Sequence, residues 1–389
     1  MSVFLANLAA ATAVMCCATA ALGCCYALFA AFAVRGFARS PGAKAPAAVP
    51  AVTVLKPLHG AEPNLYANLA GFCAQNYPGQ VQIVFGVGDP FDPAIAIVRK
   101  LIADFPDRDL ALTINPRRHG TNAKVSNLIN MARAARHEVL VISDSDIVVA
   151  PGYLSAIAAA LERPGVGLVT CLYRGTAATG MWARLAATAI DYHFLPNVLV
   201  GLKLGLTTPC FGSTIALRKT TLAGVGGFEA VADRLADDYA LGALVRHAGL
   251  TVAIPRYTVA HVCTERSARD LVRHELRWAR TIRSIQPLGF AGLVVTHALP
   301  LALLGVALGG GAPATLAVAI ALACRFTLAL ELGRAFALRN GSIWLLPFRD
   351  LLSFAIYVAS FFGNGIEWRG HRYGVQPDKT LAYYGEVES

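Results

Sequence analysis

The sequence predicts an α/β domain with a mostly parallel central sheet, joined to transmembrane helices at the N-terminal and C-terminal ends. Two observations support this fold class. The 389 residues are 56% hydrophobic and only 15% charged, which exceeds the apolar content of an ordinary soluble domain. Between two apolar ends, short β-branched runs alternate with helical stretches, a pattern typical of parallel sheets covered by helices.

The first apolar run, residues 3–34, contains no charged residue. It is longer than the ~20 residues that a helix needs to cross a hydrocarbon core, so we predict a transmembrane helix within residues 1–36. A cleaved secretory signal is the alternative, but its basic start and short apolar core are absent. Basic residues follow at Arg35, Arg39 and Lys44, and the positive-inside tendency therefore places the next domain in the cytoplasm.

The linker and the central domain come next. Residues 37–51 are rich in Pro and Ala, which predicts a linker before a domain at 52–284. Strands are expected at 52–58, 81–87, 110–115 and 138–143, alternating with helices near 62–75, 93–104 and 122–135. A second αβ portion follows at 165–265. Within it, residues 180–206 are too apolar for a free surface helix and too interrupted for a span, which favours an interfacial element.

The C-terminal third is apolar again, and a basic cytoplasmic tail is expected at 367–389. Candidate membrane helices within 285–366 lie at 286–309, 313–335 and 343–366. Charged residues interrupt them at Arg325, Glu331, Arg349 and Asp350. Four full crossings would put the basic tail on the far side, against the charge rule. We therefore predict that one C-terminal segment is re-entrant or interfacial.

Acidic residues follow the predicted strands. In parallel sheets, ligands bind beyond the carboxyl ends of the strands, so Asp89, Asp144 and Asp146 are expected on one edge. Asp-Ser-Asp is also a common turn or cap. As a functional site it would suit Mg²⁺ or Mn²⁺, which takes oxygen ligands and shares them with substrate phosphates. Asp238 opens a helix, where the helix dipole favours acids, or serves as the base for an acceptor hydroxyl.

The basic residues and the cysteines say less about the function than the acidic residues do. The net charge of +10 fits a protein lying against anionic lipid or one holding phosphates, and no nucleic-acid partner is expected. Arginines at 273, 277, 280 and 283 share one helix face, and we interpret the last two as the collar of a membrane span. The nine cysteines form no CxxC pair and no zinc spacing, which favours reduced thiols.

Seven motifs, in order, carry a family resemblance. "VLKPLHG", "GDPFDP", "NAKVSNL", "SDSD", "GSTIALRK", "ADDY" and "HELRW" resemble the ceramide glucosyltransferases, inverting enzymes with a GT-A fold. The chain looks most like their bacterial branch, the hopanoid-biosynthesis glycosyltransferases. The similarity covers about residues 52 to 284. It implies a UDP-sugar-dependent lipid hexosyltransferase of the bacterial inner membrane that uses Mg²⁺ or Mn²⁺.

The resemblance also implies site residues. Asp238 matches the catalytic base, and Asp144 and Asp146 match the D-x-D motif, with Asp146 the more direct metal ligand. The remaining matches are Asp89 at the uridine, Lys124 and Asn127 as nucleotide contacts, Arg277 and Trp278 at the diphosphate and acceptor, and His193 at the lipid acceptor.

Two departures and two alternatives accompany the resemblance. His274 stands where the family signature has Arg or Gln, and no role is carried to it. Asp146 stands where the animal ceramide enzymes have glycine, which strengthens the expectation of a divalent metal. A processive polysaccharide synthase shares the acidic and Arg-Trp motifs, and a non-enzymatic membrane scaffold or transporter subunit would need only caps and topology signals. Glucose on ceramide and N-acetylglucosamine on a bacteriohopanetetrol-type polyol both stay open.

Overall fold

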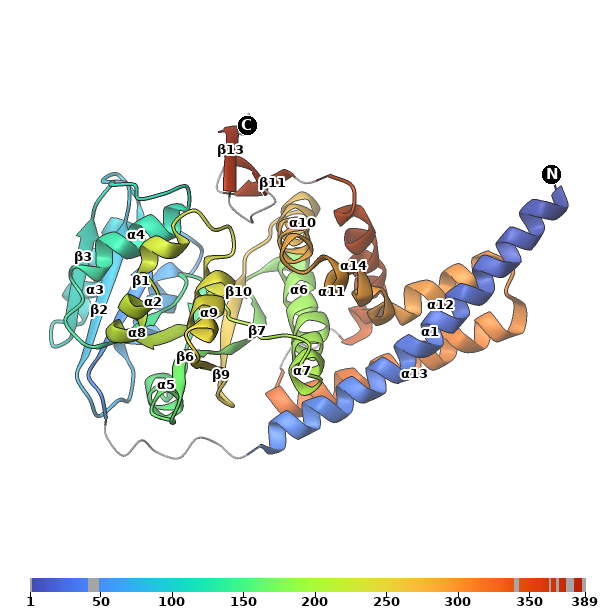
Figure 1. The fold of residues 1–389 in the computed structure, drawn as a ribbon, viewed down its shortest axis with the longest axis horizontal. Coiled ribbons are helices and arrows are strands. Elements are labelled where there is room, and N and C mark those ends of the chain that lie inside the picture. Colours follow the sequence, from blue (N-terminus) through green and yellow to red (C-terminus); the bar gives the residue numbers. More distant parts are fainter. Residues whose placement is uncertain are drawn as a thin grey trace. The chain divides into compact units, whose positions relative to one another are not determined.

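The computed structural model describes residues 2–40, 49–338, 343–363, 365–368, 371–375 and 381–386. The chain forms two compact units (Figure 1). The sheet unit consists of Ser40–Ala178, Thr208–Thr264 and Arg369–Ser389, and the helical unit of Met1–Arg39, Thr179–Thr207 and Glu265–Trp368. The segment 179–207 and the residues after 265 thus group with the apolar helices, so the continuous domain expected at 52–284 is divided. Its functional boundaries stay a prediction, and most of the expected linker lies outside the described residues.

A seven-stranded sheet, in the order β3-β2-β1-β4-β8-β6-β9, forms the centre of the sheet unit. Its strands are β1 (Val52–Pro57), β2 (Val81–Val87), β3 (Asp109–Ile114), β4 (Val139–Ile142), β6 (Val166–Thr170), β8 (Ile215–Arg218) and β9 (Thr251–Ala253). Strand β1 pairs in parallel with β2 and β4, and β8 alone runs antiparallel to its neighbours β4 and β6. The predicted mostly parallel sheet is confirmed.

Helices cover both faces of this sheet, which explains why its strands are apolar on both sides. They are α2 (Leu65–Cys73), α3 (Ala94–Asp104), α4 (Ala123–Ala132), α5 (Tyr153–Leu161), α8 (Lys219–Gly224), the 3₁₀ turn η2 (Phe228–Val231) and α9 (Asp237–His247). Val54 of β1 belongs to a buried cluster with residues of α2, α3 and α5, whereas the next residue, Leu55, belongs to a second cluster with residues of α4, α8 and α9.

A smaller sheet lies next to the carboxylate turn. It contains β5 (Ile147–Val148), β10 (Thr258–Cys263) and β7 (Leu172–Ala177), with β10 in the middle. The apolar run at 166–173 divides at Cys171, so that β6 enters the large sheet and β7 enters the small one. Strand β5 begins one residue after Asp146, and this fixes the Asp144–Asp146 turn between the two sheets.

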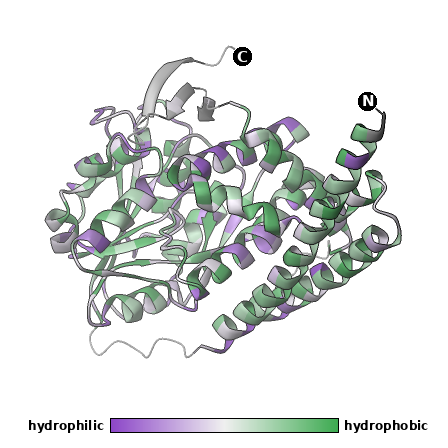
Figure 2. Ribbon diagram, turned by 45° about the vertical axis from the view of Figure 1, so that its right-hand side comes forward, coloured by the Kyte–Doolittle hydropathy of each residue, from purple (hydrophilic) through white to green (hydrophobic). Residues whose placement is uncertain are grey.

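The helical unit contains most of the apolar sequence. Its elements are α1 (Ser2–Arg39), α6 (Gly180–Ala189), the π-helix η1 (Ile190–Phe194), α7 (Leu195–Lys203), α10 (Ala268–Ile285), α11 (Pro287–Gly292), η3 (Leu293–Thr296), α12 (Ala298–Ala307), α13 (Gly311–Phe336), η4 (Ile343–Leu345), α14 (Leu346–Ser360) and β11 (Gly365–Trp368). Helix α1 is predominantly apolar along its length (Figure 2) and exposes large side chains such as Phe4, Met15 and Phe32. Such exposed apolar surface indicates contact with lipid.

Among the described residues, four helical segments are long and apolar enough to cross a membrane, which indicates a membrane protein. They are Phe4–Arg39, Gly180–Lys203, Gly311–Phe336 and Ile343–Ser360. A fifth candidate, Pro287–Thr296 with Ala298–Ala307, is bent by 66°. This geometry is that of a broken span or a re-entrant loop, as expected for one C-terminal segment. The segment 180–203 meets the criteria for a span, so its interfacial location stays a prediction.

The expected basic tail contributes strands β12 (His371–Val375) and β13 (Leu381–Glu386), which pair antiparallel, and its other residues lie largely outside the described ranges. All nine cysteines fall within the described parts of the chain and none of them is paired there, and their reduced state stays a prediction.

Candidate active site

The turn after β4 places two carboxylates beyond the carboxyl end of the sheet. Asp144 Oδ1 lies 2.6 Å from Lys124 Nζ, and Asp146 Oδ2 lies 3.6 Å from His261 Nδ1. The backbone holds this turn, because the amide of Ile147 donates to the Asp144 carbonyl and the amide of Val262 donates to the Asp146 carbonyl. The predicted position of both acids at the strand end is therefore found in the structure.

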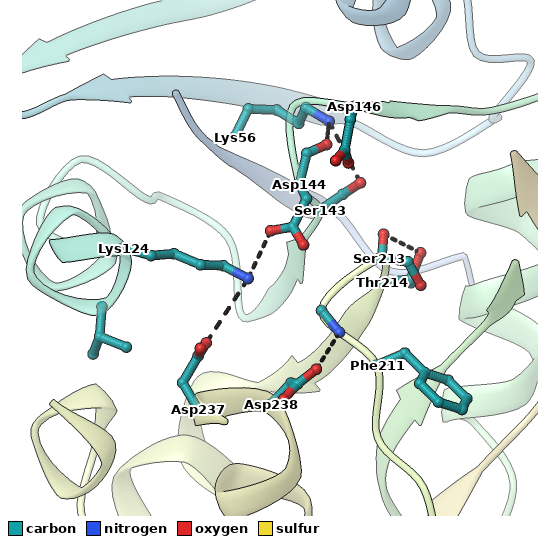
Figure 3. A network of polar contacts seen from close by, with 12 residues as sticks. Lys56, Lys124, Ser143, Asp144, Asp146, Phe211, Ser213, Thr214, Asp237 and Asp238 are labelled. Atoms are coloured by element: carbon teal, nitrogen blue, oxygen red, sulfur yellow. Dashed lines mark hydrogen bonds and ion pairs between the residues drawn. The ribbon is translucent and has the colours of Figure 1, made fainter. Parts of the chain in front are cut away.

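Lys124 connects the carboxylate turn to a second acidic pair. It lies in the first turn of α4, and Figure 3 shows its ammonium between Asp144 and Asp237, whose Oδ2 is 3.8 Å away. Burial lowers the pKa of Lys124, but the charges of Asp144, Asp237 and Asp238 more than offset this, so its pKa lies above the ordinary value. Lys124 is therefore a fixed positive charge in the middle of three carboxylates.

Asp238 has the environment of a base. Its Oδ2 accepts a hydrogen bond of 2.8 Å from the Gly212 amide, and its Oδ1 accepts one of 2.7 Å from the Tyr239 amide. Burial and the adjacent charge of Asp237 raise the pKa of Asp238 to about 6, although Lys124 and the two amides act in the opposite direction. A pKa this close to neutral suits general base catalysis.

The backbone of Gly212 lies directly against this cluster. A Cβ atom at position 212 would lie 2.9 Å from Lys124 Nζ, 3.0 Å from Asp144 Oδ2 and 3.5 Å from Asp238 Oδ2. A side chain there would displace the charged groups, so glycine is needed for the site rather than for a turn. The motif "GSTIALRK" begins at this residue, but the sequence did not reveal the reason.

We expect the Gly212→Ala variant to fold normally but to lose roughly 10 to 100-fold in activity, because its methyl group displaces Lys124 and Asp144 from their positions. The comparison is with Gly224→Ala, since no atom lies within 4 Å of a Cβ built at position 224. Thermal unfolding and catalytic activity are measured for both. Equal activity of the two variants would show that the cluster tolerates the displacement.

Lys56 is a site residue that the sequence analysis did not assign. It lies in β1, is fully buried, and its Nζ donates to the Asp144 carbonyl and lies 3.4 Å from Ser143 Oγ. The Nζ also lies 3.9 Å from the centroid of the Phe72 ring. Burial lowers the pKa of Lys56 to about 7, while Asp144 and Asp146 act to raise it. Lys56 therefore anchors the backbone of the carboxylate turn.

The carboxylate turn fits a divalent cation. Asp146 Oδ1 is buried and has no hydrogen-bond partner in the part of the chain that the structure describes. A buried carboxylate oxygen without a donor is costly unless a cation or a ligand contacts it. No group of three or more His, Cys, Asp or Glu among the described residues could hold a metal by itself. A Mg²⁺-type ion would then complete its ligands with substrate phosphates and water.

Two predicted nucleotide contacts lie outside this cluster. Asp89 is exposed, and its Oδ1 accepts a hydrogen bond from the Phe91 amide, as in a local Asp turn. Asn127 donates from Nδ2 to the Gly86 carbonyl at 2.7 Å and so ties α4 to β2. Neither contact is with the carboxylates or lysines, and the nucleotide roles of both residues stay predictions.

The remaining predicted residues belong to the helical unit. On α10 the ring of Trp278 lies 4.5 Å from that of His274, and His274 Nδ1 lies 2.6 Å from Glu265 Oε1. His274, for which no role was expected, therefore supports the tryptophan next to Arg277. His193 lies in the π-helix, and its Nε2 is 2.9 Å from Asp350 Oδ1.

The mostly parallel α/β sheet with acids beyond its strand ends is that of a GT-A fold, and the family match of this chain makes it a glycosyltransferase. The chain belongs to glycosyltransferase family 21, whose model matches residues 15–381. Ceramide glucosyltransferase 1 of Caenorhabditis elegans is 24% identical over 346 residues, which cover 84% of this chain and 72% of that protein. Ceramide glucosyltransferase of Candida albicans is 35% identical over 107 residues, only 25% of this chain and 20% of that enzyme.

A solved structure confirms the fold. The mannosyltransferase from Pyrobaculum calidifontis, in complex with GDP-Man and Mn²⁺, is 22% identical to this chain, with a TM-score of 0.51. The match covers 90% of this chain and 99% of that one. The predicted GT-A fold and the resemblance to ceramide glucosyltransferases are thus confirmed, whereas the hopanoid branch and the individual site residues stay predictions.

Proposed function

We propose that the protein transfers a sugar from a UDP-sugar to a hydroxyl group of a membrane lipid, with inversion at the anomeric carbon. The observation that carries this proposal is the cluster in Figure 3, where Asp238 lies within one site with Lys124 and Asp144. Such a cluster provides a base for the acceptor and charges for a diphosphate leaving group.

The reaction is a single displacement. Asp238 takes the proton of the lipid hydroxyl while the oxygen attacks the anomeric carbon, and the bond from that carbon to the diphosphate breaks as UDP leaves. A positioned base contributes about 10² to 10⁴-fold to the rate. By its family motif, Arg277 stabilises the negative charge on the departing diphosphate, and Trp278 and His193 face the acceptor.

The cation is proposed to be Mg²⁺ or Mn²⁺, held by Asp146 and Asp144. It would neutralise charge on the diphosphate as the sugar departs. The buried Asp146 Oδ1 supports this assignment, because a buried carboxylate oxygen without a donor is costly unless a cation or a ligand contacts it.

Two different resemblances bear on the identity of the sugar donor and the lipid acceptor. The relatives named above are ceramide glucosyltransferases, which favours UDP-glucose and ceramide. The resemblance of "DYHFLPNVLVGLKLGL" and "ADDYALG" to the hopanoid branch favours UDP-N-acetylglucosamine and a bacteriohopanetetrol-type polyol. We propose UDP-N-acetylglucosamine as the donor and the polyol as the acceptor. We also propose that the protein lies in the inner membrane of a bacterium. The sheet unit would then lie in the cytoplasm, because Arg35 and Arg39 follow the first span.

A processive polysaccharide synthase is the remaining alternative. It needs enough helices to form a polymer channel, and at most five candidate spans occur in the described residues. The non-enzymatic scaffold is not retained, because the chain belongs to a glycosyltransferase family.

Incubation of the purified protein with each UDP-sugar and each lipid, in the presence of Mn²⁺, tests the proposal. We expect UDP release that requires lipid, stops with EDTA, and gives a product that carries one sugar by mass spectrometry. A long sugar chain on the product would identify a synthase instead. No UDP release with either donor and either lipid would overturn the proposed function.

A further inference from the structure

Ionised side chains lie inside the candidate membrane helices, where they are expensive and commonly functional. Arg325 belongs to α13, and the neighbouring residues Arg349 and Asp350 belong to α14. Arg349 is only 1% exposed and Asp350 only 5%. The sequence shows these charges as interruptions of apolar segments, and no part of the proposed reaction uses them. Their partners explain why they are tolerated.

Asp350 connects α14 to α13 and to the π-helix. Arg325 donates to its carboxylate from Nε at 2.9 Å and from Nη2 at 2.8 Å, and Nη1 of the same arginine donates to the Tyr192 carbonyl at 2.6 Å. The Nε2 atom of His193 lies 2.9 Å from Asp350 Oδ1. A carboxylate only accepts hydrogen bonds, so Nε2 must carry the proton. In the neutral ring, Nδ1 is then an acceptor suited to a hydroxyl donor.

A small cavity, lined by both apolar and polar side chains, adjoins this cluster. It has a volume of about 30 Å³ and is bordered by Arg325, Asp350, His193, Tyr26 and Asn197 among others. The volume suits one or two water molecules and is far too small for a lipid headgroup. The cluster therefore orients His193 rather than enclosing the acceptor itself.

Arg349 connects the same helix to α10. It donates from Nη2 to Glu275 Oε2, and its Nε lies 3.1 Å from Ser353 Oγ. Glu275 precedes Arg277 by two residues. At the far end of α10, Arg280 and Arg283 donate to the carbonyls of residues 361–363 and 365, which follow α14. These two arginines, expected as a membrane collar, thus bind the backbone carbonyls of the segment that follows α14.

We propose that Arg349 and Asp350 are positioning residues for the acceptor side of the site. Asp350, with Arg325, fixes the orientation and tautomer of His193, and Arg349 fixes the helix that carries Arg277 and Trp278. One turn of α14 thereby sets two elements that the family motifs place near the acceptor. This inference rests on the proposed function.

A double-mutant cycle between Asp350→Asn and His193→Ala tests the Asp350 part. Activity is measured with ceramide or bacteriohopanetetrol, whichever the wild type glycosylates. We expect each single variant to raise the acceptor KM about tenfold or more, with the donor KM changed less than about twofold. The double variant should be no worse than the poorer single variant, since both changes remove one interaction. Additive effects, or an equal rise in both KM values, would overturn the role of Asp350.

Controls separate positioning from folding. Glu331→Gln breaks a different ion pair of the helical unit, the one between Glu331 and Arg35. This pair involves neither His193 nor a residue of α10. Its acceptor KM should stay at the wild-type value. Where Asp350→Asn does not purify as a monodisperse protein, Asp350→Glu replaces it in the cycle, because it retains the charge opposite Arg325 while displacing His193. The same outcomes then decide the proposal.

The exchange of Glu275→Arg with Arg349→Glu tests the Arg349 part. We expect Arg349→Glu alone to raise the acceptor KM about tenfold and the double variant to recover at least part of this loss. No recovery, with both proteins folded, would overturn the role of Arg349. If the wild type transfers no sugar to either lipid, the proposed function fails. If it transfers sugar but these variants behave otherwise than expected, only the positioning inference fails.

Discussion

Asp238→Asn is expected to lower sugar transfer by about 10³-fold while the affinity for UDP-sugar changes less than about threefold. The amide oxygen of asparagine can still accept from one of the two backbone amides, Gly212 or Tyr239, that donate to the two carboxylate oxygens, and this hydrogen bond keeps the side chain in place. What is lost is the ability to take a proton, which is worth about 10² to 10⁴-fold. Isothermal titration with UDP-sugar and a transfer assay measure the two quantities separately.

Stability gives this prediction a second readout. Because burial raises the pKa of Asp238 to about 6, the folded state binds the proton more tightly than the unfolded chain does. Protonated Asp238 therefore stabilises the folded state fully at pH values below the pKa that it has in the unfolded chain. This stabilisation is lost as the pH rises through about 6. At pH 7 the ionised carboxylate therefore lowers the stability of the folded state. The Asp238→Asn variant should melt at the same temperature as the wild type or at a higher one. A lower melting temperature would point to a structural role.

The pH profile follows from the same pKa. The base must be ionised, so transfer by the wild type should fall about tenfold per pH unit below pH 6 and level off above it. The matched control is Asp237→Asn, which removes the neighbouring carboxylate and should reduce transfer less than tenfold. Loss of UDP-sugar binding in Asp238→Asn would remove Asp238 from the role of base.

The strands could be predicted from the sequence because their apolar runs are buried on both faces of one sheet. Each run from 52 to 143 coincides with a strand to within about two residues. The run at 166–173 was harder, since its division at Cys171 depends on β6 and β7 joining different sheets. That choice is set by pairing with β8 and β10, which lie far along the chain.

The acids of the site were visible for a different reason. Asp144 and Asp146 stand directly after a buried strand, and Asp238 stands at a helix start, so local sequence marks them. No local sequence feature of this kind identified Lys56 as a site residue. In an apolar strand a lysine is expected to be exposed, and its burial depends on the Asp144 carbonyl, 88 residues away.

The intramembrane charges show the same limit. The sequence could reveal that Arg325 and Asp350 interrupt apolar segments. It could not reveal that the two side chains form an ion pair in which their charges neutralise each other. Partners 25 residues apart meet only once two helices have packed. Local patterns thus identified where the polar groups lie, and packing decided which of them contact one another.

Asp146→Asn is expected to reduce transfer about 10²-fold at a fixed Mn²⁺ concentration and to raise the Mn²⁺ concentration that gives half-maximal activity. The reason is geometric, since Asp146 Oδ1 is buried and without a donor, whereas Asp144 is engaged by Lys124 at 2.6 Å. Excess Mn²⁺ should therefore restore part of the activity of Asp146→Asn but not that of Asp144→Asn. Metal titrations of transfer by both variants test this difference.

The control for these changes is Asp233→Asn, which alters an exposed carboxylate that accepts from Thr121 and should leave transfer unchanged. Wild-type activity that persists in EDTA, with an unaltered Asp146→Asn variant, would contradict the metal assignment. The diphosphate would then be neutralised by Lys124 and Arg277 alone. In that case Lys124→Met should be as damaging as Asp238→Asn, because Lys124 is the cation that pairs with the Asp144 carboxylate in the cluster of Figure 3.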